Sequence, residues 1–340
     1  MNKDFTHLRV ASGYSFKYGA AHVEELVAKA ATYEMSVLAL TDRDTMAGAI
    51  RFAQGCEAAG ITPILGINIS FIQKKHRVTL LAQGGHLSSL YRLVTAINMN
   101  SDEKILTLEI LDRFQEYSKN VLLLHGPESA LAASIAARRS NESLSIYHST
   151  GEYFAEQAIE CVSHYAQGDG PYSTTHAAKM LGFARDNDLP AVLTNAARML
   201  GRKDGPIADV LDSARHLRSL SGKIVERSNS EGYLKSSPQM SAVADEIARR
   251  AGERNGRSLL KTTDEWAQRA RLSIRNDIGI GDIHLPEPHV LGSADHSALR
   301  EQLRNRCAEG LSARYSGAPS VAAAERLEDE LSVIDGLGFH

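Results

Sequence analysis

Over the first 200 residues, short apolar runs rich in β-branched side chains alternate with segments in which apolar residues recur at helical spacing. The runs predict strands at 37–42, 63–72, 77–83, 120–126 and 190–195, and the segments predict helices at 23–34, 45–60, 87–100 and 175–188. Strands that alternate with helices and are apolar on both faces indicate a mostly parallel sheet or a β/α barrel.

Three residues are expected to mark the ends of helices. Thr45 is placed to cap the start of the second helix, and Gly60 is placed to end it in the left-handed conformation. Gly336 is expected to stop the last helix of the chain.

The C-terminal part of the chain has a different character. Residues 199–285 are more polar, more arginine-rich and mainly helical in pattern, with a loop-like stretch at 221–232. A link punctuated by proline follows at 284–297, and then helical patterns at 298–315 and 321–339. The apolar face of the last helix has no following segment to receive it, so we expect this chain to be the N-terminal piece of a longer protein.

Composition excludes several classes of protein. The net charge of −3 and the pI near 6.5 give no overall basic field, so binding of DNA needs a local patch or a further region. The three cysteines are far apart and show no CxxC pairing, which argues against disulfides and a structural zinc site. No apolar run is long enough to span a membrane. We expect a cytoplasmic protein.

In parallel sheets and barrels, functional groups gather where strands end. The most polar strand end is LTDRD, in which Asp42 and Asp44 suit a divalent cation but equally suit helix capping and pairing with Arg43. His125, at the end of NVLLLHG, is the best single candidate for a site histidine, although a lone histidine there is also typical of a structural residue. Both interpretations stay open on these residues alone.

The stretch from Phe5 to Gly66, with HLRVAS, ALTDRD and AGITPILG in order, resembles the N-terminal PHP domain of bacterial DNA polymerase III alpha subunits, especially error-prone or actinobacterial-type members. RVTLLAQ, PAVLTNAARML, GYLKSSPQM and the closing RLEDELSVIDGLGF also resemble that family. The resemblance implies a distorted (β/α)7 barrel of mostly parallel strands. It implies a PHP domain at 1–285, with a barrel core at about 1–200 and a helical extension at 200–285. Residues 286–340 would then lead into the polymerase palm.

The same resemblance places a metal cluster at strand ends, and most of its ligand positions hold other residue types here. The former cluster positions are Arg9, Ala11, Tyr18, Asp42, Arg43, Asp44, Asn68, Arg77, Pro127, Ala196 and Arg198. Because arginine stays protonated and cannot donate to a metal, we expect no metal and no catalytic residue in this chain. Arg9 and Arg43 are expected to pair with Asp42 or Asp44. An ion-pair or anion site is predicted at Arg9, Asp42, Arg43, Asp44, His125 and Arg198.

Three functions follow from the resemblance and the lost ligands. The first is a metal-free structural or partner-docking module of a DNA-directed DNA polymerase, a nucleotidyltransferase whose Mg²⁺ sites lie in a domain beyond this chain. Its expected partners are the rest of the polymerase chain, DNA through that chain, and a proofreading or other replisome subunit, with no membrane. The second is a metal-dependent PHP phosphoesterase or 3′–5′ proofreading exonuclease. The third is a barrel whose arginines bind an anion without turning it over.

Overall fold

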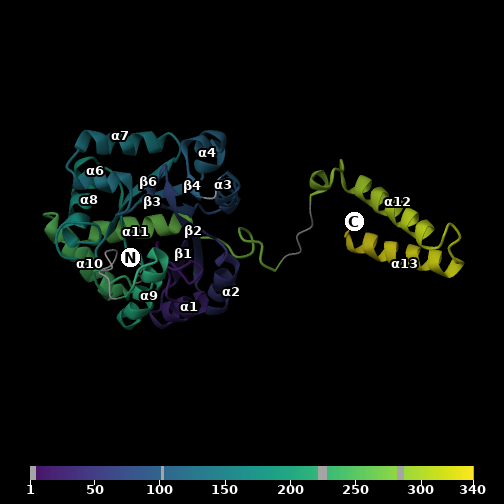
Figure 1. The fold of residues 1–340 in the computed structure, drawn as a ribbon, viewed down its shortest axis with the longest axis horizontal. Helices are drawn as coiled ribbons and strands as arrows, with labels where there is room; N and C mark the ends of the chain where they lie inside the picture. Colours follow the sequence, from purple (N-terminus) through teal and green to yellow (C-terminus); the bar gives the residue numbers. More distant parts are fainter. Residues whose placement is uncertain (1–4, 101–102, 221–227, 282–286, 340) are drawn as a thin grey trace. The chain divides into compact units, whose positions relative to one another are not determined.

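The computed structural model describes residues 5–100, 103–220, 228–281 and 287–339 (Figure 1). By their contacts these residues form two compact units, 1–280 and 281–340. The strands that the structure describes and the candidate site lie in the first unit, and the second contains a pair of helices. The loop-like stretch predicted at 221–232 falls mostly on 221–227, which lie outside the described residues.

A single seven-stranded sheet organises the first unit. Its strand order is β1-β2-β3-β5-β6-β7, with the short β4 paired to β2 off this path. All pairings are parallel except those of β3, which runs antiparallel to both β2 and β5. The fold is therefore α/β with a mostly parallel sheet, as the alternation of apolar runs and helical segments predicts. The strands are β1 Val37–Arg43, β2 Thr62–Phe71, β3 Gln73–Ala82, β4 Ile105–Leu106, β5 Val121–His125, β6 Glu156–Val162 and β7 Ala191–Thr194.

Residues 7–11 join the two edges of this sheet. The backbone oxygens of His7 and Val10 accept hydrogen bonds from the β1 amides of Ala39 and Thr41. On the other side, the Ala11 amide donates to the oxygen of Ala197, and the Ala197 amide donates to the oxygen of Arg9. This N-terminal segment thus lies between β1 and the chain that follows β7, and it closes the sheet into a distorted barrel.

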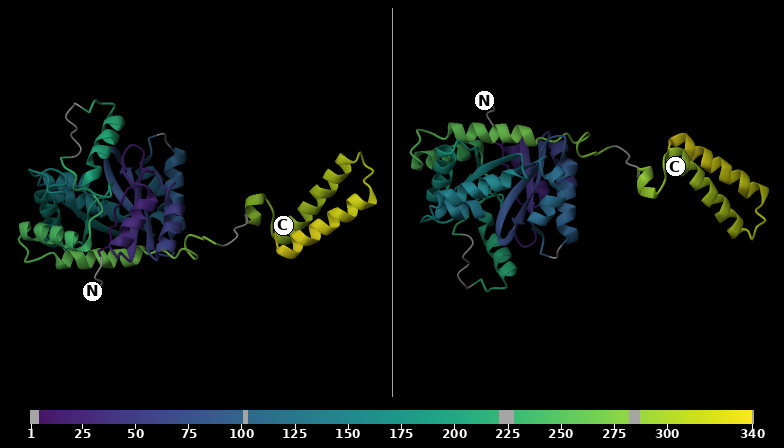
Figure 2. Two further views of the ribbon diagram at one scale, coloured as in Figure 1. Left: turned by 90° about the horizontal axis from the view of Figure 1, so that it is seen from below. Right: turned by 90° about the horizontal axis from the view of Figure 1, so that it is seen from above.

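Helices surround the strands of the first unit (Figures 1 and 2). Gly60 ends α2 at φ 67°, as predicted, but Thr45 does not cap this helix, since a turn separates Thr45 from the first helical residue, Ala49. The helices of this unit are α1 Val23–Thr32, α2 Ala49–Ala59, α3 Leu87–Asn100, α4 Leu108–Arg113, α5 Gln115–Ser118, α6 Ala130–Ala136, α7 Ser140–Gly151, α8 Thr174–Asp186, the 3-10 helix η1 Arg202–Asp204, α9 Gly205–His216, α10 Ser237–Arg250 and α11 Arg257–Ala270.

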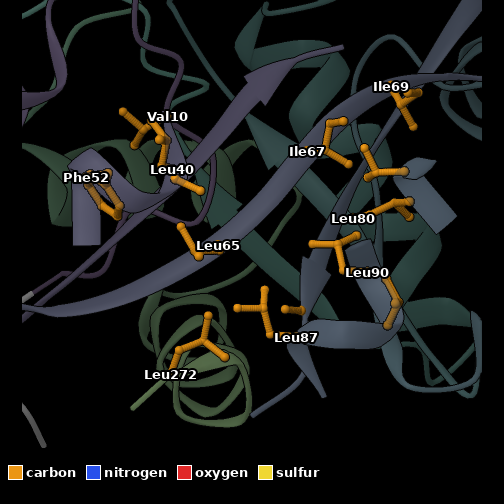
Figure 3. Packing of buried hydrophobic residues seen from close by; sticks show 14 of the residues in the cluster. Val10, Leu40, Phe52, Leu65, Ile67, Ile69, Leu80, Leu87, Leu90 and Leu272 are labelled. Carbon is orange, nitrogen blue, oxygen red and sulfur yellow. The ribbon is translucent and has the colours of Figure 1, made fainter. Parts of the chain in front are cut away.

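Apolar side chains form layers on both faces of the sheet. The outward face packs on the helices, and Figure 3 shows part of this layer, in which Leu40, Leu65 and Leu80 of the strands lie near Phe52 and Leu90 of α2 and α3. A smaller inner core fills the barrel with residues of several strands and three residues of α11. The inner core consists of Leu8, Val37, Ala39, Ile64, Leu81, Leu122, Leu124, Ala158, Val192, Trp266, Ala267 and Ala270.

The arginine-rich extension is an integral part of this unit. Helix α11 runs along one side of the unit (Figure 2) and covers the end of the barrel where the parallel strands begin. There the oxygen of Pro63, at the start of β2, accepts from the Leu272 amide, and Arg269 pairs with Glu156 at the start of β6. With this end covered, the opposite end is where polar groups of the strands and loops meet.

The second unit consists of the 3-10 helix η2 Pro288–Leu291 and the helices α12 His296–Arg314 and α13 Val321–Leu337. Helix α13 continues past Gly336 and ends at Gly338, where φ is 70°, so the predicted stop at Gly336 is wrong by two residues. Gly336 keeps a helical backbone because the left-handed residue that ends this helix is Gly338. Among the described residues, no helix has both the length and the apolar character needed to span a lipid bilayer.

We predict that Trp266→Ala lowers the free energy of unfolding by about 3–5 kcal/mol, because the indole fills the covered end of the inner core and leaves a cavity when removed. Urea unfolding followed by far-ultraviolet circular dichroism measures the change. Val333→Ala is the matched control, since this side chain is 61% exposed in the second unit and its loss should cost less than about 0.5 kcal/mol. Equal losses in both variants would contradict the role given to α11.

Candidate functional site

Charged side chains converge at the end of the barrel opposite α11. Alternation along each strand decides which side chains reach this point, because successive residues of a strand face opposite sides. Ala39 and Ala158 belong to the inner core, and Arg43 and Glu160 follow them on the same strands by an even number of residues. The side chains of Arg43 and Glu160 therefore face the inside of the barrel. Arg77 likewise precedes Leu81 on β3. We call Arg9, Arg43, Asp44, Arg77, Glu128 and Glu160 the arginine–carboxylate cluster.

Glu128 is the centre of this cluster. Its carboxylate accepts from Arg9 Nη2 at 2.7 Å on one oxygen and from Arg43 Nη2 at 3.0 Å on the other. Arg9 also reaches Glu160, with 3.3 Å between Nη1 and Oε2, and the side chain of Glu160 is fully buried. These bonds join the barrel-closing segment, the end of β1, the loop after β5 and the strand β6.

The charges of the cluster support one another. Burial alone would raise the pKa of Glu128, but Arg43, Arg9 and Arg77 outweigh it and lower this pKa to about 2. Burial raises the pKa of Glu160, and the adjacent Arg9 only partly offsets that effect. Burial also disfavours the charged form of Arg9, yet Glu160 and Glu128 hold its pKa well above the ordinary value. Glu128 and Arg9 therefore each favour the charged form of the other, while burial opposes the charged form of Glu160.

Arg77 forms the outer part of the cluster. Its Nη2 lies 2.7 Å from Asp44 Oδ1, and its Nε donates to Asn68 Oδ1 at 2.8 Å. Asn68 in turn donates through Nδ2 to Thr79 Oγ1 at 3.1 Å. An arginine and an amide thus bond to each other at two of the positions where the resemblance places metal ligands.

Tyr18 is a platform for further arginines. The guanidinium carbons of Arg43 and Arg198 each lie 4.1 Å from the centre of its ring, and that of Arg215 lies at 5.1 Å. Arg198 forms a bidentate pair with the buried Asp212 of α9, at 3.2 and 2.8 Å. The cation–π contacts with Tyr18 and the ion pair between Arg198 and Asp212 therefore attach α9 to the barrel opening.

Asp42 lies apart from these arginines. It belongs to the outward face of β1, and its carboxylate accepts from the Ser12 amide at 2.6 Å and from the hydroxyls of Ser12 and Ser15. Burial raises its pKa. The prediction that Arg9 and Arg43 pair with Asp42 or Asp44 is wrong, because Glu128 takes both arginines and Asp44 pairs with Arg77.

His125 also points away from the cluster. It follows Leu124 of the inner core by one residue, so it faces the outer helices, where its Nε2 lies 2.9 Å from Gln157 Oε1. Burial lowers the pKa of His125 to about 4, so the ring is neutral. The structure therefore separates His125 from Arg9, Arg43 and Arg198. Of the remaining former ligand positions, Ala11 and Ala196 line the barrel opening, and Pro127 is buried beside Glu128.

The side chains present here do not fit a divalent metal ion. Each carboxylate of the cluster accepts from an arginine, and most positions where the resemblance places metal ligands hold alanine, tyrosine, proline or arginine. Within the part of the chain that the structure describes, no group of three or more His, Cys, Asp or Glu side chains is arranged to hold a metal. The space between Arg9, Tyr18, Arg43 and Asn68 is only about 10 Å³.

Sequence reasoning missed three acids of this region. Glu160 carries a signal, since it is a lone charge inside the apolar strand QAIECV, and such a residue needs a buried partner. Glu128 directly follows Pro127, a former ligand position. Asp212 lies among buried positions of α9 and could be recognised only from the packing of that helix.

With this geometry in view, residues 7–168 match the family model of the PHP domain. This match covers just under half of the chain and begins at the first residue of the segment that closes the barrel.

Over nearly its whole length the chain is similar to bacterial DNA polymerases. It is 28% identical to an error-prone DNA polymerase of Symbiobacterium thermophilum, over 98% of this chain and 31% of that protein. It is 26% identical to the DNA polymerase III subunit alpha of Bacillus subtilis, over 98% of this chain and 28% of that protein. The chain therefore spans about three-tenths of the length of these relatives.

Among solved structures, a two-domain protein from Bacteroides vulgatus that contains a predicted PHP-like metal-dependent phosphoesterase aligns with a TM-score of 0.37. The sequence identity is 11%, over 57% of this chain and 52% of that chain.

We predict that Glu128→Gln lowers the free energy of unfolding at pH 7 by about 2–4 kcal/mol, because Arg9 and Arg43 lose their shared charge partner in a mostly buried site. A carboxylate with a lowered pKa stabilises the folded state above its ordinary pKa and loses that effect as pH falls. The difference between the parent chain and Glu128→Gln should therefore shrink from about pH 4.5 toward the pKa of about 2. Chemical unfolding at a series of pH values measures it.

Glu103→Gln is the control for this measurement. Glu103 pairs with Lys74 at 3.2 Å, but the two side chains are 60% and 72% exposed. The loss of such a surface pair costs less than about 1 kcal/mol. If Glu128→Gln were as stable as Glu103→Gln at pH 7, the cluster would not have the stabilising role given to it.

Proposed function

We propose that this chain is the N-terminal region of a longer, cytoplasmic DNA polymerase III alpha-type protein. The support is its similarity, over 98% of its length, to an error-prone DNA polymerase and to a DNA polymerase III subunit alpha. The parent protein is then a DNA-directed DNA polymerase, a nucleotidyltransferase in replication or repair synthesis. The Mg²⁺ of that reaction belongs to a polymerase domain beyond this chain, where the parent contacts DNA.

Within that parent, we propose that this PHP domain is a metal-free, non-catalytic module that supports the rest of the polymerase chain and docks partners such as a proofreading or other replisome subunit. The observation that carries this proposal is the arginine–carboxylate cluster. Arg9 and Arg43 stand at former ligand positions, and both bond to Glu128. Hydrogen-bonded ion pairs here connect the strand ends that a metal cluster would otherwise connect.

Electrostatics makes this replacement hard to combine with a metal ion. A fixed guanidinium repels a divalent cation by about 1–4 kcal/mol per close pair of unit charges, at effective dielectric constants between those of water and a protein surface. Arg9 and Arg43 share the carboxylate of Glu128, and Arg77 lies close enough to lower its pKa. A metal ion entering this space would have to displace these guanidinium groups from their carboxylates.

The two alternative functions receive less support. A metal-dependent phosphoesterase or 3′–5′ exonuclease needs several ligands to hold the metal ions that activate water. The carboxylates of this cluster are instead paired with arginines. An anion site needs guanidinium groups free to bind the anion. Arg9, Arg43, Arg77 and Arg198 each pair with a carboxylate of the protein instead.

Metal analysis combined with an activity assay tests the module role. We expect the purified chain, after dialysis against Mn²⁺ or Zn²⁺, to retain well below one metal ion per chain. We also expect no hydrolysis of bis-p-nitrophenyl phosphate above background in the presence of Mn²⁺, because no bound metal is there to activate water. Stoichiometric metal together with turnover that Glu160→Gln abolishes and Glu103→Gln preserves would overturn the proposal.

The assignment to a polymerase is tested separately. The coding sequence downstream of His340 should encode the acidic polymerase motifs, and the protein expressed from the whole reading frame should extend a primer with deoxynucleoside triphosphates and Mg²⁺. A reading frame without those motifs, or a full-length product without primer extension, would contradict the assignment.

A further inference from the structure

A cavity of about 390 Å³ lies at the open end of the barrel, beside the arginine–carboxylate cluster. Its volume is within the range of small-molecule sites and is far larger than the gap of about 10 Å³ inside the cluster. Its lining comes from the N-terminal loop, the loop after β5, the loop between β6 and α8, and the segment after β7. Among the lining residues are Tyr18, Glu128, His164, Gln167, Tyr172 and Arg198.

Aromatic rings form one wall of this cavity. His164 and Tyr172 are stacked with 4.8 Å between ring centroids and 14° between ring planes. Tyr172 has a left-handed backbone, with φ 66°, a conformation that costs energy for a bulky residue. The stacked pair offers a flat aromatic surface at the opening, whereas the ring of Tyr18 is already covered by arginines.

The lining of the cavity includes two phenol groups. The hydroxyls of Tyr18 and Tyr172 both belong to residues that line the cavity, and neither makes a hydrogen bond among the described residues. Burial is the main reason why the pKa of Tyr172 lies well above its ordinary value, so this hydroxyl keeps its proton. Each hydroxyl can therefore both donate to and accept from a ligand.

His164 offers an acceptor. Its Nε2 lies 2.8 Å from the backbone oxygen of Asn195, which can only accept, so Nε2 carries the proton. Burial lowers the pKa of His164 to about 4, so the ring is neutral and Nδ1 is left with a lone pair. Glu128, whose side chain is 24% exposed, adds acceptor capacity from the edge of its carboxylate.

The charges around the cavity disfavour an anionic ligand. Arg198, the arginine of the lining, uses both terminal nitrogens on Asp212 and its Nε on the oxygen of Tyr18. Arg9 and Arg43 are engaged by Glu128. A cation is disfavoured as well, since the carboxylate of Glu128 is already shared by two guanidinium groups.

We propose that this cavity binds an uncharged planar nitrogen heterocycle of the nucleobase class, as the free base or nucleoside. A ring of that kind stacks on aromatic side chains and carries both donors and acceptors at its edge, which matches the two hydroxyls, Nδ1 of His164 and the edge of Glu128. This site goes beyond the structural role proposed above and stands or falls independently of it.

Isothermal titration calorimetry on the whole 340-residue chain tests the proposal, with adenosine, guanosine, cytidine and uridine as separate probes and inorganic phosphate as the anionic probe. We expect saturable 1:1 binding of at least one nucleoside and none of phosphate. Tyr172→Phe keeps the ring but removes the hydroxyl, and we expect it to weaken binding about fivefold, the loss of one hydrogen bond. Ala166→Phe fills the cavity and should abolish binding.

Tyr165→Phe is the matched control, because Tyr165 lies on the same loop but does not line the cavity. It should change affinity by less than about twofold. Thermal unfolding of each variant separates loss of binding from loss of folding. The proposal is overturned if none of the four nucleosides binds saturably, if phosphate binds where they do not, or if folded Ala166→Phe binds them as tightly as the parent chain.

Discussion

The shared carboxylate of Glu128 is the interaction on which the barrel opening depends. It holds Arg9 of the closing segment and Arg43 at the end of β1, two pieces of chain that also meet through backbone hydrogen bonds. Its low pKa of about 2 results from the arginines around it, so the acid and the bases fix one another's charge. Arg77, Asp44 and Glu160 extend the same balance to β3, the end of β1 and β6.

Much of the fold could be predicted from local patterns. Apolar runs and helical spacing locate β1, β5, β7, α1, α3 and α8 to within a few residues, because the buried faces of these elements are set by neighbours along the chain. Two features could not be found this way. The antiparallel direction of β3 depends on a tight connection to β2, and the role of residues 7–11 in closing the sheet depends on contacts with a segment almost 190 residues away.

The candidate site was predictable in its position but not in its bonding. The resemblance places Arg9, Arg43, Arg77 and Arg198 at one end of the barrel, and an arginine in a buried place needs a carboxylate. Which carboxylate it finds is a matter of strand geometry. Asp42 and His125 each lie one residue away from an inward-facing position, so both turn outward to Ser12, Ser15 and Gln157. Glu128 and Asp212 come from a loop and a helix whose distance from the arginines no local pattern reveals.

The mutual neutralisation within the cluster has an evolutionary consequence. Single replacements toward metal ligands at these positions weaken the cluster, because exchanging Arg9 for histidine takes the guanidinium from Glu160 and one of two from Glu128, while exchanging Glu128 first leaves Arg43 without its carboxylate and Arg9 with Glu160 alone. Each of these two intermediates leaves mostly buried charges less well compensated and loses stability for that reason. The first steps from this cluster toward a metal site are thus opposed by a loss of stability, whatever the metal would later contribute.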